Sequence, residues 1–255
     1  LLFALGCSKP AAAGPAAGPA AGSAAAAPTP RSAVRLDLAI APDLSSVEGS
    51  LELRYVNQEP QPVDRVRFLL FPGLVGGRMD IRRCAVDGAP VVLGGRQRDA
   101  VRAVALPRPL AQGSSATIAI SWRAAVPAIE GGGPLARTDG FASLAWCFPV
   151  PLSPRTGADL PAPHADFLCT DAASWRVRVS MPSGFVLVTA GAETGRTGVN
   201  GSSVVDLALD PARDFYLAVG AALPELAARP STNGGPAVRC LAPPGREEAA
   251  AFAAD

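Results

Sequence analysis

Short runs in which apolar and polar residues alternate fill most of the chain from residue 31 onward. In residues 34–40, the apolar side chains are separated by Arg35, Asp37 and Ala39, so one face of a strand enters a core and the other meets water. The same period of two recurs at residues 51–55, 66–70, 118–122, 175–181 and 204–209. Because turn-forming residues separate these runs, the pattern predicts an all-β fold, either a β-sandwich or saddle-like antiparallel sheets.

Turn and helix signals refine this outline. Asp87-Gly88 predicts a hairpin between residues 81–86 and 91–93, since both central positions tolerate positive φ. Residues 221–229 have a weak helical pattern, and residues 246–255 begin with glutamates and continue with alanines. We therefore expect a β domain over residues 31–242. A linker with a short helix, cut off by the end of the sequence, is expected over residues 243–255.

The first thirty residues have a different composition. Residues 1–7 are apolar and end in Gly6-Cys7, which resembles the end of a bacterial lipoprotein signal. Ala4 and Leu5 depart from the usual pattern, so an ordinary secretory signal with an incidental Cys7 is the alternative. Residues 8–30 are almost entirely Ala, Gly, Pro and Ser, which predicts a disordered tether. We expect an exported protein, anchored by a lipid on Cys7 to a bacterial membrane that faces the periplasm or cell surface.

Composition and charge exclude other classes. The chain has 255 residues, of which 49% are hydrophobic, enough to bury one sizeable core. Its 23 basic and 22 acidic residues are interspersed and give a net charge of +1. This balance argues against nucleic acid as a partner. No stretch after the N-terminal segment is long and apolar enough to span a bilayer.

Four cysteines remain when Cys7 is set aside: Cys84, Cys147, Cys169 and Cys240. An even number in an oxidising compartment indicates two disulfides. We favour Cys147 with Cys169, which closes the proline-rich loop between them and leaves Cys84 for Cys240. Four buried free thiols are the alternative. No pair has the close spacing of a zinc knuckle or a redox motif.

Candidate catalytic and ligand-binding residues are few. His164 is the single histidine and lies between Asp159 and Asp166, so these groups are a conceivable metal or proton-transfer site; a solvated loop histidine is the better interpretation. A Ser-His-Asp triad would require His164, and no Gly-x-Ser-x-Gly elbow accompanies it. The glycine-rich residues 130–134 are interpreted as a hairpin tip rather than an anion cradle.

The tryptophans and two late aspartates have structural interpretations as well. Trp122, Trp146 and Trp175 suit a sugar-binding platform in principle, but strand alternation assigns Trp122 and Trp175 to the core. Asp210 and Asp214 flank the start of the last predicted strand. We interpret them as a turn cap and a charge at the end of a strand.

Three features in order resemble the N-terminal β domain of the aminopeptidase N family of zinc metallopeptidases. They are the strand pair in residues 34–56, the segment Trp146-Cys-Phe-Pro149 followed by residues 171–191, and the strand in residues 212–220. The resemblance therefore covers about residues 34–220. In the family, a His-Glu-x-x-His helix and a downstream glutamate hold zinc, and a Gly-x-Met-Glu-Asn strand holds the free amine of the peptide.

These catalytic motifs are missing from this chain, which has a single histidine. The resemblance thus implies an accessory domain that is inactive alone and binds no cofactor. The implied partner is a peptidase domain of the same polypeptide, which is missing here. That peptidase domain would hold the zinc, and the β domain would form part of the wall of its peptide cleft. Active members of the family often have Pro-Cys-x-Asp at the place of residues 146–149. Because this sequence differs there, we assign none of its residues a role in substrate binding. The alternatives are a stand-alone β-sandwich binding or adhesion module of a surface lipoprotein, or a parent without its zinc ligands.

Lipidation predicts a specific effect of Cys7→Ala. The wild-type protein should partition with membranes and carry the added mass of acyl chains, because those chains enter the bilayer. The variant should lose both properties, as measured by mass spectrometry and membrane fractionation. An unchanged mass and unchanged partitioning would contradict the prediction.

Overall fold

The computed structural model describes residues 31–96, 99–130, 132–138, 140–155, 170–221, 223, 225–229 and 238–241. These residues fall into two compact units, of which the larger runs from Arg31 to Leu223. Within the described residues, no helix has the length and apolar character needed to cross a membrane. The predicted tether and the predicted helix in residues 243–255 lie outside the described residues.

One strand pair belongs to the smaller unit. Strand β16 (Glu225–Arg229) pairs antiparallel with β17 (Val238–Leu241). The weak helical prediction for residues 221–229 is therefore wrong, since β15 ends at Ala221 and β16 begins at Glu225. A helix of this length is only marginally stable in water. Pairing with β17 instead gives the backbone N–H and C=O groups of β16 hydrogen-bond partners.

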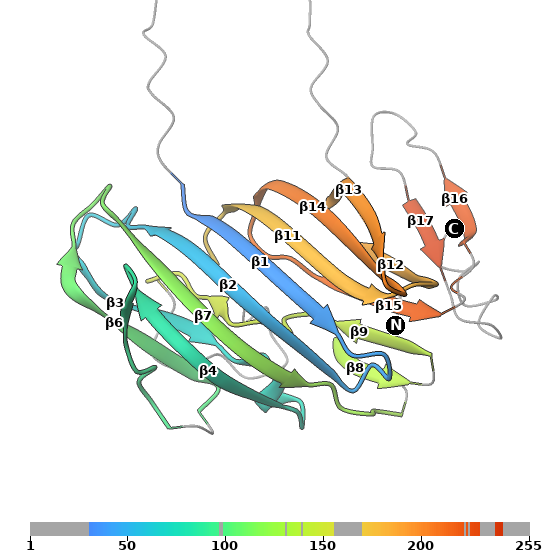
Figure 1. Ribbon diagram of the computed structural model, residues 1–255. Helices are drawn as coiled ribbons and strands as arrows, with labels where there is room; N and C mark the ends of the chain where they lie inside the picture. Colours follow the sequence, from blue (N-terminus) through green and yellow to red (C-terminus); the bar gives the residue numbers. More distant parts are fainter. Residues whose placement is uncertain are drawn as a thin grey trace, which may run out of the picture. The chain divides into compact units, whose positions relative to one another are not determined.

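The larger unit is built on an eight-stranded sheet in the order β13-β14-β11-β1-β2-β7-β4-β5, shown in Figure 1. Neighbouring strands are antiparallel except β1 and β11, which are parallel. The bounds are Ala33–Ile40 for β1, Ser46–Val56 for β2, Arg78–Val86 for β4, Ala89–Pro90 for β5, Ser115–Ala125 for β7, Ala173–Pro182 for β11, Ala192–Val199 for β13 and Ser202–Ala212 for β14.

Two smaller sheets accompany the large one (Figure 1). The three-stranded sheet has the order β10-β3-β6, and the four-stranded sheet has the order β12-β15-β9-β8. The bounds are Val150–Pro151 for β10, Val63–Leu69 for β3, Val101–Leu110 for β6, Phe185–Thr189 for β12, Leu217–Ala221 for β15, Phe141–Leu144 for β9 and Leu135–Thr138 for β8. A single 3₁₀ turn, Phe71–Leu74, follows β3. The fold is all-β with mainly antiparallel sheets, as predicted.

The core follows the predicted alternation. In β1, every second residue from Val34 to Ile40 is buried, and the residues between them are partly or fully exposed. One core cluster contains residues from the large sheet and from both small sheets. Trp122 and Trp175 are each 1% exposed, which confirms that they are core residues. Their indole N–H groups donate to the carbonyl oxygens of Cys147 (2.9 Å) and Ala212 (3.1 Å).

The hairpin at Asp87-Gly88 is also confirmed. Asp87 has φ of 48° and Gly88 has φ of 82°, the positive values that such a turn requires. The Asp87 carboxylate accepts a hydrogen bond from the backbone N–H of Thr117 at 2.8 Å. The returning strand is β5, Ala89–Pro90, rather than residues 91–93. One further backbone hydrogen bond, from the Val91 N–H to the Cys84 carbonyl oxygen at 2.9 Å, follows this strand.

Gly49 provides a test of core packing. It is directly opposite Trp122 in the β2–β7 pair, so both positions face the same side. A Cβ atom at position 49 would lie 2.6 Å from Cζ2 of Trp122 and 2.8 Å from the carbonyl oxygen of Asp37. Gly49→Ala should therefore lower the free energy of unfolding by about 1 to 3 kcal/mol. Chemical denaturation measures the loss.

Gly73→Ala is the matched control, because nothing lies within 4 Å of a Cβ atom built there. It should leave the unfolding midpoint nearly unchanged. Equal midpoints for both variants would show that Gly49 is not required to accommodate the Trp122 ring.

Candidate functional site

His164, Asp159 and Asp166, which the sequence analysis interprets as part of a solvated loop rather than a site, lie outside the described residues. The lipidation candidate Cys7 and the disulfide candidate Cys169 lie outside them as well. Their proposed roles stay predictions. In the part of the chain that the structure describes, no group of three or more His, Cys, Asp or Glu residues could hold a metal ion. One network of polar contacts lies around the connection after β2.

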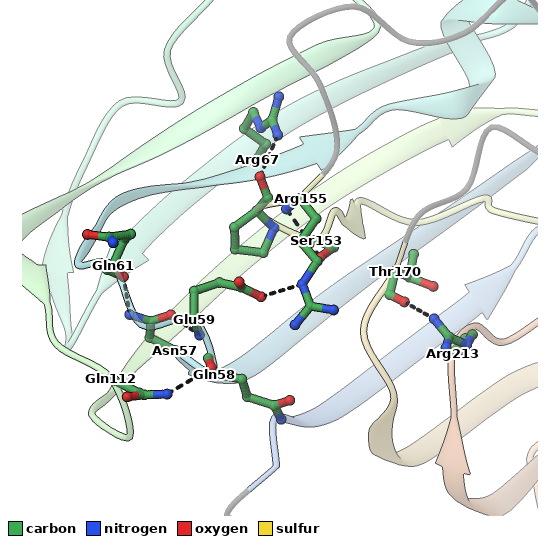
Figure 2. A network of polar contacts seen from close by, with 11 residues as sticks. Asn57, Gln58, Glu59, Gln61, Arg67, Gln112, Ser153, Arg155, Thr170 and Arg213 are labelled. Carbon is green, nitrogen blue, oxygen red and sulfur yellow. Dashed lines mark hydrogen bonds and ion pairs between the residues drawn. The ribbon is translucent and has the colours of Figure 1, made fainter.

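Asn57 is the buried centre of this polar network (Figure 2). Its side chain is fully used: Nδ2 donates to the carbonyl oxygens of Gln61 (2.9 Å) and Leu110 (2.8 Å), and Oδ1 accepts from the Glu59 N–H (2.9 Å). The residue itself is 0% exposed. Each such bond contributes about 0.5 to 1.5 kcal/mol, and a buried unpaired amide would cost more. Asn57 thus fixes the loop that carries Glu59.

Glu59 and Arg67 hold one end of the segment made of residues 156–169. The Arg155 Nε donates to Glu59 Oε1 at 2.7 Å, and Arg67 Nη2 reaches the carbonyl oxygen of Pro154 at 3.5 Å. Figure 2 shows Glu59 and Arg155 pointing toward each other. Because the Arg155 side chain is 70% exposed, its ion pair is worth about 1 kcal/mol or less. The contact positions the backbone and contributes little to stability.

A third arginine holds the other end of that segment. Arg213 Nη1 donates to the carbonyl oxygen of Thr170 at 2.9 Å, as Figure 2 shows. Thr170 is 3% exposed. The described residues on both sides of residues 156–169 are therefore tied to side chains that lie far away in the sequence. Sequence reasoning missed Asn57, Arg67 and Arg213; the one available signal was an isolated Asn directly after an apolar alternation.

The segment Trp146-Cys-Phe-Pro149 packs inward rather than presenting a binding surface. The Trp146 ring meets Phe71 edge-on with centroids 4.8 Å apart, and its Nε1 donates to Asp214 Oδ2 at 3.4 Å. Cys147 and Phe148 are both 0% exposed. Trp146 has φ of 53°, a left-handed conformation uncommon for a large side chain. The three tryptophans therefore form no exposed platform.

The two late aspartates make structural contacts, but Asp210 lies within β14 and does not form the predicted turn cap. The Asp210 carboxylate accepts a hydrogen bond from the Ser174 hydroxyl at 2.7 Å, next to the end of β14. Asp214 accepts from Trp146 just before β15. Burial, and secondarily the charge of Asp214, raises the pKa of Tyr216. Nothing in this arrangement places two carboxylates for acid–base chemistry.

The glycine-rich residues 130–134 are not a hairpin tip. They connect β7 of the eight-stranded sheet to β8 of the four-stranded sheet. The carbonyl oxygen of Pro134 accepts hydrogen bonds from the Ala145 N–H (2.9 Å) and the Ser143 hydroxyl (2.8 Å). A connection between sheets needs the same turn residues as a hairpin, so composition alone could not separate the two.

Comparisons with known proteins agree with this fold. No protein-family model and no curated protein matches the sequence. Solved structures do match. A zinc metallopeptidase of the M1 family from Deinococcus radiodurans, an E323A mutant bound to Tyr-Ser-Ala, matches with a TM-score of 0.52 and 19% identity, over 78% of this chain and 43% of that chain. The fold is that of the N-terminal β domain of M1 zinc aminopeptidases.

Two further structures extend the match to this N-terminal β domain. A two-domain M1 zinc metallopeptidase bound to L-tryptophan has a TM-score of 0.54 and 20% identity, over 83% of this chain and 48% of that chain. Aminopeptidase A of Legionella pneumophila, in complex with aspartic acid, has a TM-score of 0.56 and 13% identity, over 85% and 24%. The chain thus spans less than half the length of each of these structures.

Two described cysteines bear on the disulfide prediction. Cys84 is 8% exposed and Cys147 is 0% exposed, and both are free thiols in the structure. Burial raises the pKa of the Cys147 thiol to about 12. The side chains of Cys169 and Cys240 lie outside the described residues, so both predicted pairings stay predictions.

Alkylation of Cys147 separates the alternatives. Because the thiolate is the reactive form, iodoacetamide at pH 8 should not label Cys147 in the native protein. A free thiol should react fully once the protein is denatured, whereas a Cys147–Cys169 disulfide would also require reductant. Peptide mapping by mass spectrometry gives the result, with protein purified without reductant from an oxidising compartment. Labelling of the native protein would contradict the buried position of Cys147.

Proposed function

We propose that this chain is the accessory N-terminal β domain of an exported, zinc aminopeptidase-like metallopeptidase. In this proposal it packs beside the catalytic domain of the same polypeptide and helps to wall the peptide cleft. The observation that carries the proposal is the fold shared with M1 zinc metallopeptidases, over 78% to 85% of this chain. More than half of each matching structure lies outside the match, which leaves room there for the domain that performs the chemistry.

The sequence supports an accessory role. It has one histidine, whereas the His-Glu-x-x-His zinc motif requires two. The aromatic and polar groups considered above are occupied by packing or by backbone contacts. Zinc, in this proposal, belongs to the catalytic domain, where it would polarise the scissile carbonyl and activate water. This domain would contribute shape and rigidity to the cleft.

Export and membrane attachment form a second part of the proposal. The apolar residues 1–7, the cysteine that follows Gly6, and the tether composition of residues 8–30 support it. A lipid on Cys7 would hold the folded domain near a membrane, and the tether would allow it to extend from the surface. This part is tested by the Cys7→Ala experiment, independently of the peptidase proposal.

Zinc binding and aminopeptidase activity test the main proposal. The 255-residue chain should bind no stoichiometric zinc and should not hydrolyse aminoacyl-nitroanilides. The polypeptide encoded by the complete reading frame should bind zinc and hydrolyse these substrates, lose activity with a chelator, and regain it with added zinc.

Three outcomes would overturn the proposal. Tight zinc binding by the 255-residue chain would contradict its accessory role, and turnover by that chain would do the same. Inactivity of the complete polypeptide, together with the absence of zinc, would favour a stand-alone binding module of a surface lipoprotein.

A further inference from the structure

Strand β12 differs from the other strands that lie at sheet edges. Its sequence, Phe185-Val-Leu-Val-Thr189, has no charge and no proline, and all five side chains are half-buried. The other edge strands of the larger unit are protected against further pairing. Strand β6 contains Pro107 and Pro109, β13 has an ion pair between Glu193 and Arg196, β5 and β10 have two residues each, and β8 has four.

The strand register shows which side chains lie on each face of the four-stranded sheet. Leu187 of β12 is opposite Val219 of β15, which is opposite Ala142 of β9. Val219 and Ala142 belong to the core, and Leu187 packs against it. The neighbouring positions therefore face the other way. Two rows of neighbouring residues lie on that outer face. One row is Val186, Gly220 and Phe141, and the other is Val188, Ala218 and Ser143.

The outer face of this sheet is apolar, in contrast to the outer face of the large sheet. On the large sheet, Glu48 lies 3.0 Å from both Arg82 and Arg123, and Arg178 pairs with Asp206 at 2.8 Å. None of the eight outer positions of the four-stranded sheet is charged, including Ala136 and Thr138 of β8. When both faces of a strand are apolar, both faces are typically covered by other parts of the protein. Of the six outer positions on β12, β15 and β9, Gly220, Ala218 and Ser143 are buried, whereas Phe141, Val186 and Val188 are only half-buried.

We propose that the β12 surface, defined by Phe141, Val186 and Val188, is where the peptidase domain of the same polypeptide packs. This inference rests on the proposed function. An apolar, uncharged and partly covered surface fits the centre of an interface between domains. Its partner surface would be apolar as well, since a charge buried there would lack a counter-ion.

The course of the chain supports this occupant. The larger unit ends at Leu223, and the Leu223 side chain lies over Gly220 of β15, 3.0 Å from where a Cβ atom would stand. The chain therefore leaves this unit beside β12. Matching structures of the same fold contain more than half of their length outside the match. The segment that leads to any following domain therefore departs from β15, the strand that pairs with β12.

Site-specific labelling tests the inference. Val188→Cys is nearly isosteric and places a thiol on the β12 surface. Val92→Cys is the matched control, because Val92 is 87% exposed between β5 and β6. Both variants are made in the 255-residue chain and in the polypeptide encoded by the complete reading frame. A maleimide is added, and peptide mapping measures the labelling rate at each position.

The peptidase domain should protect the thiol introduced at position 188 and leave the thiol introduced at position 92 accessible. We expect labelling at position 188 to be at least ~10-fold slower in the complete polypeptide than in the 255-residue chain, since the reagent must wait for the interface to open. Labelling at position 92 should be equal in both. Val186→Cys repeats the test at a second position, and circular dichroism confirms that each variant is folded.

The outcomes separate this inference from the proposed function. Equal rates at positions 186 and 188 in the two proteins would overturn the inference, even if zinc binding and hydrolysis confirm the function. Slow labelling in the 255-residue chain that becomes faster on dilution would assign the surface to a second copy and overturn the inference too. Protection in a complete polypeptide without zinc or hydrolysis would refute the peptidase domain as the occupant.

Discussion

The hydrogen bond from the Trp122 indole to the Cys147 carbonyl is the contact on which the layered arrangement depends. Trp122 belongs to β7 of the eight-stranded sheet, and Cys147 lies where the chain passes from β9 of the four-stranded sheet to β10 of the three-stranded sheet. One buried bond therefore ties the large sheet to the crossing point between both small ones. Gly49 makes the arrangement possible, because any larger residue opposite Trp122 would occupy the space of the ring.

The sequence predicted the elements whose two faces differ most. Strands β1, β2, β7 and β11 have one apolar and one polar face, so their alternation was clear before the structure was known. Strand β12 is apolar on both faces, and its periodicity therefore gives no indication of which face enters the core. Residues 225–229 were interpreted with a helical pattern because the partner strand β17 is invisible to any local analysis.

The site was less predictable than the fold. Whether a tryptophan lies in a core or on a platform follows from strand alternation, and Trp122 and Trp175 were assigned correctly on that basis. The role of Asn57 depends on carbonyl oxygens at Gln61 and Leu110, and Leu110 lies in a different strand. Arg213 likewise meets Thr170 only through the fold. Contacts of this type become visible only when the sheets are assembled, which is why the sequence analysis identified none of these residues.

The parallel pairing of β1 with β11 has a consequence for how the chain assembles. It joins Ala33 to Ser174 and continues to Ala39 with Ser180, so the middle of the large sheet consists of partners from opposite parts of the domain. Closing such a long loop before any contact forms makes folding slow. During synthesis, β1 can pair with β2, but its other edge must wait for β11 to emerge from the ribosome. The large sheet is therefore completed late, after most of the domain has been made.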